Sequence, residues 1–398
     1  MKDINIRVFL FSAWYPMEFI PLAGNFVQNH AKAISKLAQV IVIHPYEDVA
    51  YTQKQAYTID ETQIEKLIEI RIKYKGIKNK TCFGKLMRFF RFCRSYQKGI
   101  QLAVKKYGKP TVSHVNILTR TAIPALMLKR KYKVPFIITE HWTRYLPEND
   151  SFKGFFRKKF TQYVVKQAAA ITPVSFHLQQ AMQAHGLQSN NYQVVPNVVD
   201  TVLFQPSFVE KKKKSILHVS SLNYKQKNFA GILRVINKLA QKRTDFVLDV
   251  VHDCDNSVYL PFIEENNLHS FVVFHGQKTG EELVKHFNEA DFFVLFSNYE
   301  NLPCVLIESF ACGKPVVSTN VGGIPSIVNE DRGILIDMKN ENALEDALNY
   351  MLDHSQDYNS SAIRDYAVEN FSEDAVGKMF LNIYICAKTN HKINNKYK

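Results

Sequence analysis

The sequence lacks the signals of several protein classes. Its six cysteines are scattered and form no CxxC pair, which argues against zinc, iron–sulfur and disulfide-rich scaffolds and fits a reducing cytoplasm best. Nowhere do about 18 apolar residues follow one another, so we expect no membrane-spanning helix. The opening residues, MKDINIRVFLFSAWYP, have too short an apolar core for a signal peptide. These absences predict a cytoplasmic protein.

Length and charge indicate two unlike halves. At 398 residues, with 46% hydrophobic residues, the chain is predicted to form two globular domains of about 200 residues each. Residues 1–204 carry 30 Lys and Arg against 12 Asp and Glu, whereas residues 205–370 carry 16 against 23. The N-terminal half is therefore basic and the C-terminal half acidic.

The basic excess is greatest from Arg71 to Lys109, which includes 13 basic residues and no acid. Within it, FGKLMRFFRFCRSYQKG alternates aromatic and basic residues as a basic amphipathic helix does. Three interpretations stay open: a solvated basic face whose aromatics lie in the core, docking on anionic lipid, and nucleic-acid binding. No recognised nucleic-acid module accompanies the charge, so we expect no nucleic-acid partner. Peripheral association with the inner membrane face is kept as a hypothesis.

The strongest functional signal is SNYENLPCVLIESFACGKPVVSTNVGGIP, residues 297–325. The apolar run before it, Phe292–Phe296, predicts a buried parallel strand. A helix should follow, with Asn301 as its N-cap and Pro303 in its first turn, and Gly313 should end it. Such a turn lies at the carboxyl edge of a parallel sheet, where the unpaired N–H groups of the helix offer a seat for phosphate.

Two carboxylates mark this helix. Glu300 precedes it, and Glu308 lies roughly 7 to 9 Å further along the axis. Because the two do not share a helical face, we expect no paired acid and base. The offset suits an elongated ligand whose sugar meets Glu300, whose diphosphate meets the helix start and whose ribose hydroxyls donate to Glu308. The alternative is that both are ordinary surface residues.

The segment ENLPCVLIE, followed by SFACGKPVVSTNVGGIPSIV, resembles the donor-site signature of the retaining glycosyltransferases of family 4, which have the two-Rossmann-domain GT-B fold. The resemblance covers most of the C-terminal half and several segments of the N-terminal half. It implies that Glu300 is catalytic, positioning the sugar and supporting positive charge that develops on it. It also implies donor contacts around the helix start from Asn301, Leu302, Pro303, Val305 and Glu308.

Two residues of the N-terminal half extend the resemblance. Gly24 lies between a first strand, Ile4–Phe11, and a helix from about Asn25 to Leu37, where a glycine lets backbone approach a phosphate. This arrangement is similar to the family's first loop, which closes over the donor diphosphate and the acceptor. His141, in TEHW, follows a strand-like run, and the resemblance implies a catalytic contact with the donor sugar. Its neighbour Glu140 is a weaker candidate.

One loop departs from the family. The common pattern is Gly-Arg-Leu, three residues, then Lys, whereas this chain has VSSLNYKQKN. Ser221 stands where the Arg would be, and the loop is one residue longer if Lys227 is the matching lysine. A single hydroxyl cannot replace a charged fork. Either Lys225 shares the charge of the donor diphosphate, or the helix end after Asn301 carries more of it.

The predicted fold is α/β, with two Rossmann-like, doubly wound parallel-sheet domains facing a cleft. Residues 1–203 would bind the acceptor and residues 204–372 the nucleotide sugar, and VVPNVVDTVLF is similar to the family's hinge-side motif. A final helix, from Ser372 to about Lys388, should cross back to the N-terminal domain. The last ten residues are predicted to be disordered.

The expected reaction moves a sugar from a UDP-sugar or GDP-mannose to a hydroxyl of a glycan or lipid-linked saccharide in surface polysaccharide or glycoconjugate synthesis. The resemblance implies retention of configuration. No DxD motif or ligand cluster is present, so we expect neither metal nor other cofactor, the nucleotide sugar being a substrate. Two alternatives are a non-catalytic sugar-nucleotide-binding or membrane-docking protein, and a sugar-nucleotide epimerase, against which Glu-x7-Glu and NVGGIP argue.

Overall fold

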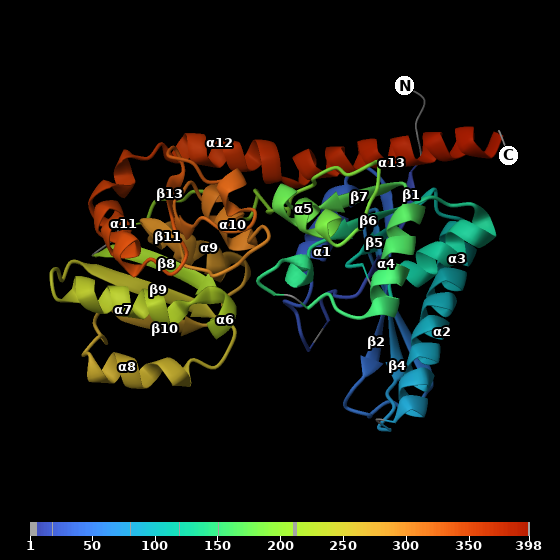
Figure 1. Ribbon diagram of the computed structural model, residues 1–398, viewed down its shortest axis with the longest axis horizontal. Coiled ribbons are helices and arrows are strands. Elements are labelled where there is room, and N and C mark those ends of the chain that lie inside the picture. The colour runs from blue at the N-terminus through green and yellow to red at the C-terminus, as the bar shows by residue number, and fades with distance from the viewer. Residues whose placement is uncertain are drawn as a thin grey trace. The chain divides into compact units, whose positions relative to one another are not determined.

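The computed structural model describes residues 6–396 except 18, 80, 119, 150 and 210–212. The chain divides into two compact units, Met1–Val195 together with Glu373–Lys398, and Pro196–Ser372. Each unit is built on one sheet with helices packed against it (Figure 1). The α/β class and the two parallel-sheet domains predicted from the sequence are confirmed.

The first unit has a seven-stranded sheet in the order β3-β4-β2-β1-β5-β6-β7. Its strands are β1 (Arg7–Ser12), β2 (Gln39–Asp48), β3 (Tyr57–Ile64), β4 (Leu67–Lys75), β5 (Val112–Asn116), β6 (Phe136–Glu140) and β7 (Ala170–Pro173). Its helices are α1 (Asn25–Ser35), α2 (Cys82–Tyr107), α3 (Ala122–Tyr132), α4 (Phe155–Gln167), α5 (Phe176–Ala184) and α13 (Glu373–Lys396). The strands run parallel except β3, a largely exposed edge strand antiparallel to β4.

The predicted first strand, Ile4–Phe11, corresponds to β1, and its residues Ile4 and Asn5 lie outside the described residues. Central strands such as β5 are buried throughout because helices cover both faces of the sheet. The antiparallel hairpin of β3 and β4 was not predicted from the sequence, since it departs from the β–α alternation of the rest of the unit.

The second unit has a six-stranded parallel sheet in the order β10-β9-β8-β11-β12-β13. Its strands are β8 (Lys214–Ser220), β9 (Phe246–His252), β10 (Val272–Gly276), β11 (Phe292–Leu295), β12 (Val316–Thr319) and β13 (Gly333–Ile336). Its helices are α6 (Tyr224–Lys227), α7 (Phe229–Ala240), α8 (Leu260–Glu265), α9 (Gly280–Glu289), α10 (Cys304–Ala311), α11 (Glu341–His354) and α12 (Ser360–Phe371). Phe229, Phe246 and Phe292 are among the fully buried side chains of its core.

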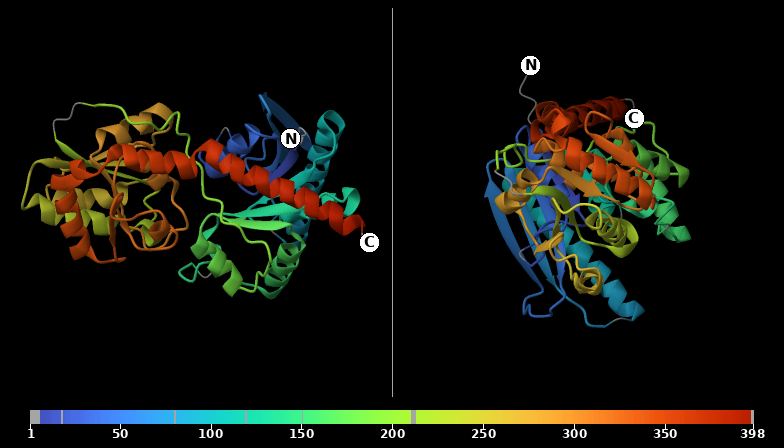
Figure 2. Two further views of the ribbon diagram at one scale, coloured as in Figure 1. Left: turned by 90° about the horizontal axis from the view of Figure 1, so that it is seen from above. Right: turned by 90° about the vertical axis from the view of Figure 1, so that its left-hand side faces the viewer.

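The C-terminal helix α13 belongs to the first unit, as predicted, and packs beside α1 on one face of the first sheet (Figure 2). The rings of His30 and Phe380 lie 5.0 Å apart, and Lys36 Nζ lies 2.8 Å from a Glu373 carboxylate oxygen. The helix is assigned as far as Lys396, and the disorder predicted for the last ten residues stays a prediction. A helix nucleated by packing extends at little further cost.

No helix among the described residues combines the length and the apolarity needed to cross a bilayer. All six cysteines are free thiols, with no disulfide between them.

Candidate functional site

The predicted helix of the donor signature is α10, and it starts later than the sequence indicated. Pro303, not Asn301, is at the N-cap position, with φ −69° and ψ 124°, and no side-chain hydrogen bond caps the helix. Proline has no side-chain acceptor to offer. The first-turn N–H groups, Val305 among them, therefore lie at a helix start without a side-chain cap, where the helix dipole favours an anion.

Glu300 is paired with Lys227. Lys227 Nζ lies 2.5 Å from one Glu300 carboxylate oxygen, and the two side chains are only 13% and 6% exposed. The Glu300 carboxylate also accepts hydrogen bonds from Ser297 Oγ at 2.9 Å and Gln226 Nε2 at 3.2 Å. The predicted sugar-positioning carboxylate and the predicted diphosphate lysine thus form one buried ion pair.

Two loops are joined around this pair. The Asn298 N–H donates to the Gln226 carbonyl at 2.7 Å, and Asn298 Nδ2 donates to the Lys225 carbonyl at 2.9 Å. These bonds tie the loop after β11 to α6, the short helix that ends at Lys227. Because β8 and β11 are neighbours in the sheet, the loops that follow them meet at the same carboxyl edge.

Three residues that the sequence reasoning did not single out hold this loop in place. Gly322 has φ 60°, and a Cβ atom there would clash with the Glu300 carbonyl, so only glycine fits. The Gly323 N–H donates to the Asn301 carbonyl at 2.7 Å. Asn197 Nδ2 donates to the Leu302 carbonyl at 2.7 Å. The paired glycines of NVGGIP were a detectable signal, whereas the hinge-like motif containing Asn197 gave no sign of this contact.

Glu308 lies on α10 and is half-buried. None of the described residues donates a hydrogen bond to its side chain, and burial raises its pKa from 4.5 to about 7. Val305, three residues earlier, lies on the same side of the helix. The predicted ribose acceptor is therefore a carboxylate with open acceptor capacity one turn beyond the helix start.

The phosphate loop after β8 is more exposed. Ser221 and Lys225 both have exposed side chains. The neighbouring Ser220 hydroxyl bonds His218 Nε2 at 2.8 Å and accepts from the Leu222 N–H at 3.0 Å, and burial lowers the pKa of His218 to about 4. Ser220 is therefore engaged in folding the loop, and Ser221 and Lys225 are among the polar side chains that it presents to solvent.

In the first unit, Gly24 occupies the N-cap position of α1 with φ 71°. A Cβ atom at this position would lie 2.5 Å from the backbone carbonyl carbon of Trp14. The glycine is thus required by the backbone itself, because the loop after β1 packs directly against it.

His141 follows β6, as predicted, and is half-buried. Its Nε2 lies 3.2 Å from Asn116 Oδ1, and its ring lies 4.6 Å from that of Phe26 and 5.2 Å from that of His30. Glu140 is buried and accepts from the N–H groups of Leu118, His141 and Trp142 at 2.9 to 3.0 Å. Burial raises the pKa of Glu140, and its contacts assign it to shaping the loop rather than to a ligand.

Next to His141 lies an aromatic cluster that the sequence reasoning missed. The two tryptophans of the chain, Trp14 and Trp142, have ring centroids 4.8 Å apart, and both are half-buried. The Arg144 guanidinium lies 3.1 Å from the centre of the Trp142 ring. The signal that could have revealed the cluster is that both tryptophans closely follow strands that end at one sheet edge, after β1 and after β6.

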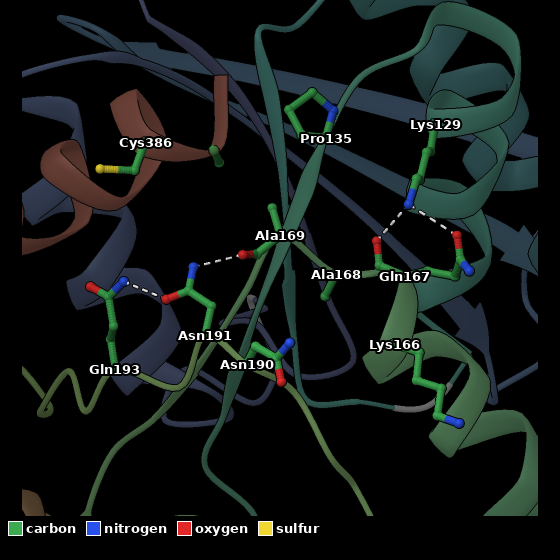
Figure 3. A pocket seen from close by; sticks show the side chains of 11 residues that line it. Lys129, Pro135, Lys166, Gln167, Ala168, Ala169, Asn190, Asn191, Gln193 and Cys386 are labelled. Atoms are coloured by element: carbon green, nitrogen blue, oxygen red, sulfur yellow. Dashed lines mark hydrogen bonds between the residues drawn. The ribbon is translucent and has the colours of Figure 1, made fainter. Parts of the chain in front are cut away.

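A separate pocket lies at the opposite, amino edge of the first sheet (Figure 3). Pro135 and Ala169, which precede β6 and β7, line it together with Lys129, Asn191 and Cys386. Lys129 Nζ donates to the Gln167 carbonyl at 2.7 Å. The volume of the pocket is about 590 Å³. No residue predicted to bind the donor lines this pocket. Within the described part of the chain, no group of His, Cys, Asp and Glu could hold a metal ion.

Comparison with known proteins identifies the family. Residues 200–367 match the family described as glycosyl transferases group 1, and residues 23–203 match glycosyltransferase family 4. This chain belongs to the family 4 glycosyltransferases. TuaC of Bacillus subtilis, a glycosyltransferase assigned to teichuronic acid biosynthesis, is 24% identical over 357 residues, covering 86% of this chain and 88% of TuaC.

Solved glycosyltransferase structures have the same fold. Sucrose-phosphate synthase from Thermosynechococcus elongatus superposes with a TM-score of 0.74 at 17% identity, covering 96% of this chain and 98% of that one. Anabaena HepE in complex with UDP superposes with a TM-score of 0.68 at 16% identity, covering 95% and 98%. The GT-B fold predicted for this family 4 glycosyltransferase is thereby confirmed.

Proposed function

We propose that this protein transfers a sugar, with retention of configuration, from a UDP-sugar or GDP-mannose to a hydroxyl of a glycan or lipid-linked saccharide in surface polysaccharide or glycoconjugate synthesis. The observation that carries the proposal is Glu308, a half-buried carboxylate to which no described residue donates, one turn beyond a helix start without a side-chain cap. This arrangement places oxygens that can accept hydrogen bonds from hydroxyl groups about 6 Å along the helix from an N-terminus that can bind an anion.

The donor would lie along α10. Its diphosphate meets the helix start at Pro303 and Val305, and its ribose hydroxyls donate to Glu308. The UDP complex of HepE supports a nucleotide donor, and the teichuronic acid role assigned to TuaC supports a glycan product. Contacts from the surrounding loops would select the base and the sugar.

Glu300 and Lys227 would act as a preassembled pair. Lys227 holds the Glu300 carboxylate in one orientation, at 2.5 Å, and its remaining N–H donors can reach a phosphate oxygen. Glu300 then positions the sugar and supports the positive charge that develops at its anomeric carbon. Lys225 and Ser221, both exposed, would contribute the remaining polar contacts of the diphosphate.

The proposed chemistry is electrostatic. The bond between the anomeric carbon and the diphosphate oxygen breaks, the bond to the acceptor oxygen forms on the same face, and the acceptor proton passes to the leaving phosphate. Helix N–H groups and lysines stabilise the charge that builds up on that phosphate. The proposed reaction requires no metal ion. In the first unit, His141 would contact the donor sugar, and Gly24 would allow close approach of the backbone to the diphosphate.

A thermal-shift screen with UDP, GDP, ADP and their sugars tests the donor site. A ligand of the folded state adds about 2.7 kcal/mol of stability at a hundredfold excess over Kd. We expect one nucleotide to stabilise the wild type, Glu308→Ala to lose most of the shift, and Glu282→Ala, at an exposed glutamate of α9, to keep it. No shift with any nucleotide would overturn the donor site.

An activity assay distinguishes a catalytic transferase from a protein that only binds the sugar nucleotide. A retaining transferase that binds donor also hydrolyses it slowly when no acceptor is present, with the product anomer readable by NMR. We expect such hydrolysis to be lost in Glu300→Gln. Donor binding without hydrolysis and without transfer to any saccharide would instead support the non-catalytic sugar-nucleotide-binding alternative.

A further inference from the structure

Three helices lie on one face of the first sheet. The connections β4–α2–β5, β5–α3–β6 and β6–α4–β7 all step toward β7, whereas β1–α1–β2 steps the other way. Because such crossovers are right-handed, α2, α3 and α4 share the face opposite α1 (Figure 1). Arg130 of α3 donates to the Tyr163 hydroxyl of α4 at 3.4 Å, which confirms that these two helices are adjacent.

The charged residues of these three helices are all basic, and Lys106 near the end of α2 pairs with Glu61 of β3. The three helices contain no Asp or Glu, and their basic residues are Lys85, Arg88, Arg91, Arg94, Lys98, Lys105 and Lys106 on α2, Lys129, Arg130 and Lys131 on α3, and Arg157, Lys158, Lys159 and Lys166 on α4. Among the described residues, no carboxylate pairs with Lys85, Arg157 or Lys158. In the second unit, by contrast, Arg234 and Lys242 of α7 both pair with glutamates of α11.

Large apolar side chains are exposed among these charges. Phe83 and Phe90 on α2 are 67% and 59% exposed, and Phe155 and Phe156 on α4 are 68% and 86% exposed. The interpretation that the aromatics of α2 lie in the core therefore fails for Phe83 and Phe90. Exposed phenylalanines flanked by lysines and arginines are typical of helices that lie in the membrane interface.

Both aromatic groups lie in the N-terminal halves of their helices. A helix that follows a parallel strand begins at the carboxyl edge of the sheet, so the exposed phenylalanines of α2 and α4 are near the same edge. Gly24 and His141 follow β1 and β6 at that edge as well. The apolar side chains are therefore concentrated at the end of the unit that carries its predicted site residues.

We propose that the N-terminal halves of α2 and α4 form a docking face for an anionic lipid bilayer, with Phe155 and Phe156 as its main apolar anchor. The basic residues attract anionic headgroups, and the phenylalanine rings insert between them. A lipid surface fits better than a nucleic acid because no recognised nucleic-acid module accompanies the charge, and exposed phenylalanines beside basic residues suit insertion between lipid headgroups. The segment Arg71–Lys109, which the sequence singled out, contributes charge and two phenylalanines but omits the α4 anchor.

Docking in this way would bring the carboxyl edge of the first sheet close to the headgroups. A lipid-linked acceptor would then present its saccharide beside His141 without leaving the membrane. This consequence rests on the proposed transferase function, whereas the docking itself does not.

Vesicle co-sedimentation of the full chain tests the docking face. We expect the wild type to bind vesicles of phosphatidylcholine mixed with phosphatidylglycerol and not vesicles of phosphatidylcholine alone. The combined change Phe155→Ala and Phe156→Ala should weaken binding about tenfold or more. The matched control is Tyr350→Ala on the acidic helix α11 of the other unit, which should bind as the wild type does. Because both phenylalanines are exposed, circular dichroism should be unchanged.

A charge-reversal variant, added salt and competing oligonucleotides complete the vesicle test. Lys158→Glu should also weaken binding to the anionic vesicles, and added salt should weaken wild-type binding without abolishing it. Equal vesicle binding by the double phenylalanine variant would overturn the proposal. So would tighter binding to single- or double-stranded oligonucleotides than to the vesicles. The nucleotide-induced thermal shift of the double variant should match the wild type, so a failed donor site and a failed docking face are distinguishable.

Discussion

Replacing Glu308 with glutamine should stabilise the protein while weakening nucleotide binding. Burial raises the pKa of Glu308 from 4.5 to about 7, which means that the fold disfavours the ionised carboxylate. Each pKa unit corresponds to about 1.4 kcal/mol, so ionising Glu308 in place costs about 3 kcal/mol. Glu308→Gln removes this cost and keeps the size and an oxygen acceptor.

The stability difference between the wild type and Glu308→Gln should depend on pH. Below pH 4.5 the carboxyl is neutral in both the folded and the unfolded state, so wild type and Glu308→Gln should be equally stable. Between pH 4.5 and about 7 the unfolded state ionises first, so wild-type stability falls relative to the variant as pH rises. At pH 8 the variant should be more stable by about 3 kcal/mol.

Urea unfolding of both proteins at pH 4.5, 6 and 8 measures this difference, and titration with UDP and GDP measures binding. The nucleotide that binds the wild type should bind the variant about tenfold or more weakly, because a neutral amide accepts more weakly from ribose hydroxyls than a carboxylate does. Binding to the wild type should strengthen as pH rises through 7. A variant less stable than the wild type at pH 8, or one with unchanged nucleotide affinity, would refute the reasoning.

Four further substitutions test the geometry of the second unit. Lys227→Met should destabilise the protein by about 3 kcal/mol in urea unfolding, because it leaves the buried carboxylate of Glu300 without its cation, and an unchanged midpoint would contradict the buried pair. Gly322→Ala should lower the melting temperature and abolish transfer, whereas a neutral alanine would show that the positive φ is not required. Asn197→Ala should cost roughly 1 to 3 kcal/mol in the same unfolding assay by removing a buried hydrogen bond, and a smaller effect would tell against that bond. Ser221→Arg should tighten nucleoside diphosphate binding several-fold in titration calorimetry, and weaker binding would place this side chain away from the phosphates.

Local sequence patterns were sufficient for the strand and the helix of the donor signature. The apolar run before the donor signature predicted β11, and the glycine and proline after it predicted the end of α10, because strand length and helix termination are decided by neighbouring residues. The sequence predicted Asn301 as the N-cap, whereas Pro303 occupies that position. The Gly323 N–H and the Asn197 side-chain amide hold that loop through hydrogen bonds to its carbonyls, and tertiary contacts of this kind override the capping preference of a single residue.

The sequence named candidate residues for the site one by one, but it did not show how they are arranged. Glu300 and Lys227 were both selected from the sequence, yet their ion pair joins positions 73 residues apart and depends on the pairing of β11 with β8. The aromatic cluster of Trp14 and Trp142 likewise depends on strand order rather than on spacing along the chain. The charge of α2 was evident from the sequence, but the exposure of its phenylalanines depends on which helical face packs on the sheet.

The ion pair of Lys227 and Glu300 affects how the negative charge of a donor diphosphate would be neutralised. Lys227 and Glu300 together carry no net charge, so a nucleoside diphosphate bound beside them gains less from the lysine than it would from an unpaired cation. With Ser221 in place of the family's arginine, the helix start at Pro303 and the exposed Lys225 would have to supply most of the remaining stabilisation in the proposed site. Helix N–H groups are fixed in direction and unaffected by pH. In the proposed donor site, the loop after β8 would therefore tune donor affinity, while α10 would determine where the diphosphate lies.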